Sequence, residues 1–145
     1  MSVLQAIARP GHDLHQAATT FLNNAAGRAL TISRATYMEA LCSWSKQQVK
    51  AVLQRYGIAF DATVGLEQIV PMARRLQRAF VGTNRVLEDT DAMQIAGAVL
   101  GERTWVTADI TAYYRAVDLG VSAQYVGSAE KMANAARYVR EAVTY

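Results

Sequence analysis

The stretch from residue 88 to residue 127 constrains the fold more than any other segment. Its pattern of apolar and polar residues predicts a helix, a strand, an acidic turn, a second helix and a last strand. We expect Asp91 to begin the first helix and Asp109 to follow the strand that contains Trp105 and Val106. Acids so placed can meet at the carboxyl edge of a parallel sheet, where open α/β sheets keep their sites. Two such carboxylates would form half of a divalent-metal site of the kind that acts on phosphate groups.

Helices and short strands alternate along the rest of the chain. Amphipathic spacing predicts four more helices, over residues 13–26, 36–56, 63–80 and 128–143. Ser33 or Thr36 should cap the second of these, with Thr36 and Glu39 spaced as a capping box, and Pro71 should kink or split the third. Short apolar runs predict strands over residues 29–32 and 58–60. This alternation indicates a helix-rich α/β fold with a small parallel sheet of three or four strands.

The size and composition of the chain predict one domain over residues 1–145. At 52% hydrophobic residues the chain can form a core, yet no apolar run approaches the ~20 residues that cross a bilayer. The first ten residues lack the basic start and the cleavage site of a signal peptide. Cys42 is the only cysteine, which excludes an internal disulfide and fits a reducing cytoplasm. We expect Cys42 to fill space in a helix core.

The net charge of +3 allows a nucleic-acid partner without demanding one. Basic residues are concentrated in one region and acidic residues in the next: Arg74, Arg75, Arg78 and Arg85, then Glu88, Asp89 and Asp91. A basic flank beside an acidic pocket suits a phosphate backbone drawn to a metal site, and a solvated helix face is the alternative. Tyr113 and Tyr114 could stack on a base, although we expect Tyr113 in the core.

Three segments, in this order, resemble the PIN domain, and within it the small VapC-type toxin ribonucleases of bacterial toxin–antitoxin pairs. RPGHDLHQAATTFL is similar to the first helix of the family. ALTISRATYMEALC is similar to the second strand and the helix that carries a glutamate, and TDAMQIAGAVLGERTWVTADITAYYRAVDLGV to the segment with two later acids. The resemblance assigns these acids to Glu39, Asp91 and Asp109, with separations of 52 (91 − 39) and 18 (109 − 91) residues. It implies a PIN-like three-layer fold, with the small parallel sheet flanked by helices.

The resemblance also implies a function. Members hydrolyse RNA phosphodiesters with a divalent metal, so Glu39, Asp91 and Asp109 would be both the catalytic residues and the ligands of Mg²⁺ or Mn²⁺. These hard cations prefer carboxylate oxygens. Arg34 and Arg85 are candidates for phosphate contacts. The expected partners are RNA, an antitoxin protein and a second copy of the chain, with no membrane partner.

The chain departs from the family pattern at two points. The family opens with a hydrophobic strand that ends in Asp-Thr or Asp-Ser, whereas SVLQAIARP looks like the segment just after that aspartate, which would fall immediately before Met1. The fourth acid of the family, a residue or two beyond Asp109, is absent, and Ile110, Thr111 and Ala112 stand there. Asp13 is acidic and near in sequence, but it falls at a helix start, so we do not expect it to substitute.

Each acid also has a structural interpretation. Glu39 could serve only as a capping-box partner, Asp91 as an acid favoured by the helix dipole, and Asp109 as part of a strand end. The chain would then be a non-catalytic, degenerate PIN-like module that binds a partner protein, which the missing first aspartate favours, or a mostly helical structural protein. Convergence of the three carboxylates would separate the nuclease from the structural protein.

An N-terminal extension tests the alignment of the first segment. A hydrophobic strand ending in Asp-Thr, added before Met1, should cover unpaired backbone groups of the sheet and complete the anionic ligands. We expect a higher melting temperature and Mn²⁺-dependent RNA cleavage, measured by thermal unfolding and gel electrophoresis. If the unextended chain is monomeric, melts like an ordinary domain and cuts RNA at full rate, the alignment is wrong.

Overall fold

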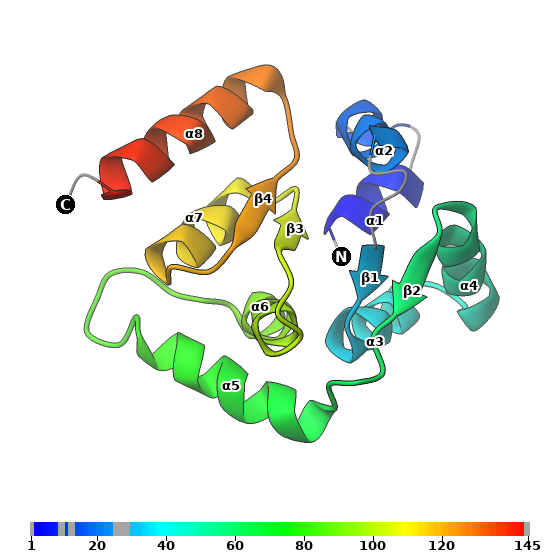
Figure 1. Cartoon of the computed structure of the whole chain (residues 1–145), viewed down its shortest axis with the longest axis horizontal. Helices are drawn as coiled ribbons and strands as arrows, with labels where there is room; N and C mark the ends of the chain where they lie inside the picture. The colour runs from blue at the N-terminus through cyan, green and yellow to red at the C-terminus, as the bar shows by residue number, and fades with distance from the viewer. Residues whose placement is uncertain (1, 9–10, 12–13, 25–29, 144–145) are drawn as a thin grey trace. The chain divides into compact units, whose positions relative to one another are not determined.

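The structure is a computed structural model that describes residues 2–8, 11, 14–24 and 30–143 (Figure 1). The chain forms two compact units. We call Gly27–Arg103 the central unit, and Met1–Ala26 together with Thr104–Tyr145 the terminal unit. Each unit combines helices with one pair of parallel strands, which confirms a helix-rich, mixed α/β chain with small parallel sheets. The single domain over residues 1–145 and the joining of both strand pairs in one three-layer fold stay predictions.

The central unit holds two strands and four helices. Strand β1 (Leu30–Ile32) pairs in parallel with β2 (Ile58–Phe60). The helices are α3 (Arg34–Ser43), α4 (Lys46–Arg55), α5 (Leu66–Arg78) and α6 (Asp89–Leu100). Helix α6 packs against both α5 and α3, and in Figure 1 it is seen end-on beside α5. Its buried residues include Ala92, Ile95 and Ala96. The small residues on α6 allow the neighbouring helices to approach closely.

The long helix predicted over residues 36–56 is wrong, because the chain forms α3 and α4 instead. The hydroxyl of Ser33, rather than Thr36, caps α3 and accepts a hydrogen bond from the Thr36 amide at 3.2 Å. A capping box begins α4: the Gln48 amide donates to Ser45 Oγ at 3.1 Å, and the Ser45 amide donates to Gln48 Oε1 at 2.8 Å. Ser45 satisfies amides that start a new helix, which favours a break here. The predicted capping box of Thr36 and Glu39 is therefore wrong.

Helix α5 differs from its prediction at its start and at Pro71. Pro71 lies inside α5, but the helix runs unbroken from Leu66 to Arg78, so the predicted split does not occur. Proline removes one amide donor from a helix, yet α5 continues through Pro71, with the buried residues Ile69 and Ala73 before and after it. The helix begins after Gly65 rather than at Thr63, because the Thr63 backbone amide and hydroxyl both bind Asp61.

The terminal unit contains α1 (Ser2–Ala8), α2 (His15–Asn24), β3 (Trp105–Thr107), α7 (Ile110–Asp118), β4 (Ala123–Tyr125) and α8 (Ala129–Val143). Strands β3 and β4 are parallel, with Thr107 opposite Tyr125. Tyr113, Tyr125 and Ala135 form a buried cluster, which confirms that Tyr113 is a core residue. Burial and the neighbouring Tyr114 raise the pKa of the Tyr113 hydroxyl. Asp13 lies outside the described residues, and no described helix is long and apolar enough to cross a membrane.

Cys42 is exposed on α3, where its thiol donates to the Met38 carbonyl at 3.4 Å. The prediction that it fills a helix core is wrong. Met38 lies four residues before Cys42, on the same side of α3, and it is exposed as well. This side of the helix therefore faces away from the core.

Asp61 is a buried acid directly after β2. Its Oδ1 accepts hydrogen bonds from the Thr63 hydroxyl at 2.5 Å and the Thr63 amide at 3.0 Å. Arg103 Nε lies 3.4 Å from Oδ2. The Thr63 hydroxyl, followed by the Thr63 amide and Arg103, lowers the pKa of Asp61 below its usual 3.8, while burial opposes this shift. Asp61 thus links the end of β2 to the segment after α6.

Acid unfolding should depend on Asp61. A carboxyl whose folded pKa lies below its unfolded value stabilises the fold above the unfolded pKa, and loses this contribution as the pH falls through the folded pKa. We expect Asp61→Asn to lower the free energy of unfolding at neutral pH, and the deficit to shrink as the pH falls below 3.8. Urea titrations followed by circular dichroism would measure this difference in the free energy of unfolding between the variant and the wild type.

Two further substitutions separate the causes of the shift. Thr63→Val removes the strongest hydrogen bond, so it should weaken the pH dependence more than Arg103→Met does. A deficit that stays constant from neutral to acidic pH would show that Asp61 does not stabilise the fold through its charge.

Candidate functional site

The carboxylate of Glu39 reaches from α3 to α6. Glu39 lies in the second turn of α3, and its Oε2 accepts a hydrogen bond from Gln94 Nε2 on α6. Gln94 is only 6% exposed. Because Ser33 caps the helix, Glu39 has no capping-box role, and the structural interpretation offered by its sequence spacing does not apply. Its side chain instead makes a polar contact between two helices.

Asp91 lies in the first turn of α6 and is half-buried. Gln94 follows three residues later, and residues three apart occupy the same side of a helix. The hydrogen bond from Gln94 therefore brings the Glu39 carboxylate to the side of α6 that carries Asp91. An acid in this first turn also suits the helix dipole, so both interpretations of Asp91 stay open.

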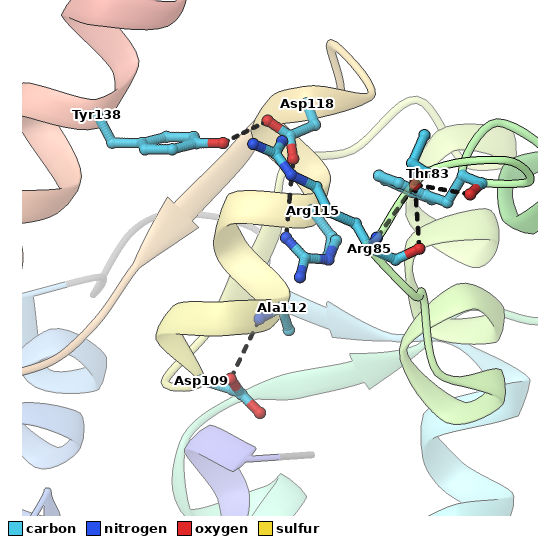
Figure 2. A network of polar contacts seen from close by, with 8 residues as sticks. Thr83, Arg85, Asp109, Ala112, Arg115, Asp118 and Tyr138 are labelled. Atoms are coloured by element: carbon cyan, nitrogen blue, oxygen red, sulfur yellow. Dashed lines mark hydrogen bonds and ion pairs between the residues drawn. The ribbon is translucent and has the colours of Figure 1, made fainter.

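Asp109 follows β3 and caps α7 in the terminal unit (Figure 2). Its Oδ1 accepts a hydrogen bond from the Ala112 amide at 3.1 Å, and its own amide donates to Thr107 Oγ1 at 3.1 Å. The pKa of the Tyr125 hydroxyl is raised above its usual value. Its burial is the main cause, and the charges of Tyr114 and Asp109 add to the effect. The predicted position of Asp109 after the strand is confirmed. Because a carboxylate has two oxygens, a cap that uses Oδ1 is compatible with metal binding by Oδ2.

The donor chemistry of these acids fits Mg²⁺ or Mn²⁺, which prefer carboxylate oxygens. Glu39 and Asp91 belong to the central unit and Asp109 to the terminal unit. Among the described residues of either unit, no three His, Cys, Asp or Glu side chains form a group that could hold a metal ion. Convergence of the three predicted ligands stays a prediction.

The two predicted phosphate-binding arginines lie in the central unit. Arg34 begins α3, two residues after the end of β1, and its guanidinium lies over the Phe60 ring, 5.6 Å from its centre. This cation–π contact orients an exposed cation beside the strand ends. Arg85 lies between α5 and α6, where its amide donates to Thr83 Oγ1 at 3.1 Å (Figure 2). Phosphate binding by either residue stays a prediction.

A network of polar side chains connects the end of α5 to the start of α6. Asp89 Oδ1 accepts a hydrogen bond from Gln77 Nε2 at 2.6 Å and lies 3.3 Å from Arg74 Nη1. Gln77 also donates to the Leu87 carbonyl at 3.1 Å. The arginines at the end of α5 therefore lie beside the helix start that carries Asp91. Arg75 and Arg78 are exposed there, as either a phosphate-binding or a solvated surface would require.

Sequence reasoning missed two polar residues of the central unit, Gln94 and Asp61. Gln94 interrupts a run of apolar and small residues on α6, and a polar side chain on a buried face needs a partner. That requirement could have pointed to the Glu39 contact. Asp61 precedes Thr63 by two residues, a spacing typical of side chains that bind nearby backbone amides in turns. Asp61 serves the fold rather than the candidate site.

Another polar contact in the terminal unit joins α7 to α8. The Tyr138 hydroxyl donates to Asp118 Oδ1 at 2.5 Å, and Arg115 Nη1 lies 3.8 Å from Asp118 Oδ2 (Figure 2). The rings of Tyr114 and Tyr138 are 4.2 Å apart. These contacts hold α8 against the helix that Asp109 caps.

Comparison with known proteins identifies no relative of this chain: no family model, curated protein or solved structure matches it. The candidate site is therefore inferred from the residues and contacts of this chain alone. Its best-supported part is the pair of neighbouring helices that carry Glu39 and Asp91.

Proposed function

We propose that this chain is a PIN-type, metal-dependent endoribonuclease and the toxin of a toxin–antitoxin pair. The observation that carries the proposal is the hydrogen bond between Glu39 and Gln94. It links the helix that carries the first acid to the side of α6 that carries Asp91. Acids 52 residues apart in sequence (91 − 39) thus lie on neighbouring helices of one unit, as a shared metal site requires.

In this proposal Glu39, Asp91 and Asp109 hold Mg²⁺ or Mn²⁺ in a three-layer PIN-like fold in the cytoplasm. The bound ion would lower the pKa of a water molecule and neutralise charge on the phosphate. Arg34, held by Phe60, and Arg85 would bind the RNA backbone as cations. An antitoxin protein and a second copy of the chain are the proposed protein partners.

The second candidate is a non-catalytic, PIN-like module that binds a partner protein. Glu39 and Asp109 have structural roles that need no metal, since Glu39 binds Gln94 and Asp109 caps α7. Large apolar side chains are also exposed between α5 and α6, where Val81 is 78% and Val86 is 68% exposed. In this case the chain would bind no Mn²⁺ and cut no RNA.

Conservative substitutions of the three acids test the nuclease. Glu39→Gln, Asp91→Asn and Asp109→Asn each keep the shape of the side chain and remove its charge. We expect each to lower Mn²⁺-dependent RNA cleavage by more than about 100-fold, measured on a labelled RNA with EDTA as the blank. Each should also abolish the rise in melting temperature that Mn²⁺ causes. An unchanged response to Mn²⁺ would show that the substituted acid is not a ligand.

Asp109 offers a control for folding, because Asn caps helices about as well as Asp. Asp109→Asn should therefore retain the cap of α7, and removing a charge from a crowded acidic site should raise the melting temperature without metal. Asp109→Ala should lose the cap and about 1 kcal/mol of stability. If Asp109→Asn destabilises the protein as much as Asp109→Ala does, its charge matters to the fold rather than to a metal.

A further inference from the structure

We propose that Gln94 is a positioning residue that fixes the Glu39 carboxylate for metal binding. This inference rests on the proposed metal-dependent function and adds a residue to its site. The two side chains form a direct hydrogen bond between α3 and α6, with the Gln94 amide as donor. Gln94 would not touch the metal or the RNA, and its effect would pass through Glu39.

The burial of Gln94 indicates that its amide has a specific purpose. Ala92, Ile95 and Ala96 on the same helix are fully buried, and Gln94 is 6% exposed among them. A buried amide without a partner costs about 1–3 kcal/mol, so an apolar residue would suit this position better if it served only the core. The hydrogen bond to the Glu39 carboxylate compensates for this cost.

Close packing of the helices makes the contact possible. Gly97 lies one turn after Gln94, and a Cβ at this position would lie only 2.8 Å from the Cβ of Ser33, the residue that caps α3. The absent side chain lets the start of α3 approach α6. Glu39, in the next turn of α3, is then within reach of the Gln94 amide.

The neutral amide suits a metal ligand better than a cation would. Hydrogen bonds from surrounding groups orient metal ligands and raise their affinity. Lysine or arginine at position 94 would neutralise the carboxylate and compete with Mg²⁺, whereas the amide leaves the negative charge in place. Because Gln94 holds Oε2, Oε1 can face the ion.

The same bond could instead serve only to join two helices, and Gln77 provides the matched control. Gln77 also donates from Nε2 to a carboxylate on a neighbouring element, Asp89 Oδ1, at 2.6 Å. Asp89 is not among the proposed ligands. Methionine at either position keeps the length of the side chain and removes the donor. Gln94→Met and Gln77→Met therefore each lose an amide–carboxylate hydrogen bond, and Gln77→Met also loses the bonds to Leu87 and Arg74. Only Gln94→Met loses a contact to a proposed ligand.

The test measures Mn²⁺ affinity by isothermal titration calorimetry, and RNA cleavage as kcat and KM, on the full chain. For Gln94→Met we expect a 10- to 100-fold weaker Mn²⁺ affinity, the range usual for residues behind a ligand, and a lower kcat with unchanged KM for RNA. Gln77→Met should leave both unchanged. Gln94→His places a ring N–H as far from the backbone as the glutamine amide, so it should restore most of the affinity.

Three outcomes would overturn the inference. If the wild type binds Mn²⁺ and Gln94→Met binds it within twofold as tightly, Gln94 is only structural and the nuclease proposal survives. Equal loss in Gln94→Met and Gln77→Met would indicate a general loss of stability. If the wild type binds no Mn²⁺, the proposed function and this inference fail together.

Spectroscopy of the wild type covers the case in which Gln94→Met does not fold. The side-chain amide signals of Gln94 should shift when Mg²⁺ is titrated into isotopically labelled protein, and those of Gln77 should not. Signals of Gln94 that stay unchanged while the protein binds Mg²⁺ would overturn the inference.

Discussion

The close approach of α3 and α6 is the contact on which the candidate site depends. Gly97 has no side chain at the point where α6 meets Ser33, and Ser33 is the residue that begins α3. Glu39 and Gln94 can share a hydrogen bond only because the two helices lie this close. A larger residue at position 97 would push the helices apart, and the buried Gln94 amide would lose its hydrogen bond to Glu39.

Helix caps determine much of the remaining local structure. Ser33, Ser45 and Asp109 each begin a helix by accepting a hydrogen bond from an amide of its first turn. Ser33 directly follows β1, and Asp109 lies two residues after the end of β3. At both points the chain must change direction. Asp109 caps α7 and also lies just after the end of β3. Its cap uses Oδ1, and the proposed function assigns metal binding to the same carboxylate.

The sequence predicted the strands and the helices α2 and α8 because their patterns are local, whereas α1 was not predicted. Short apolar runs located β1, β2 and β3 within about one residue, a last strand was expected after Gly120, and Tyr113 was assigned to the core. The break at Ser45 was missed because apolar residues on both sides continue a helical spacing, and only the Ser45–Gln48 capping box reveals it. Likewise, the Asp61–Arg103 and Glu39–Gln94 contacts each join residues distant in sequence, and no local pattern specifies such pairs. Glu39 and Asp91 lie on neighbouring helices of the central unit, whereas the convergence of these two acids with Asp109 stays a prediction, because local patterns do not encode the contacts that it would need.

The exposed thiol of Cys42 has a practical consequence for experiments on this chain. Cys42 is the only cysteine, it is exposed, and it follows Glu39 by three residues on α3. A nitroxide or fluorescent probe attached there would therefore label one position, less than one helical turn from a proposed metal ligand. Its paramagnetic or energy-transfer coupling to a lanthanide would report where an ion binds without relying on catalysis.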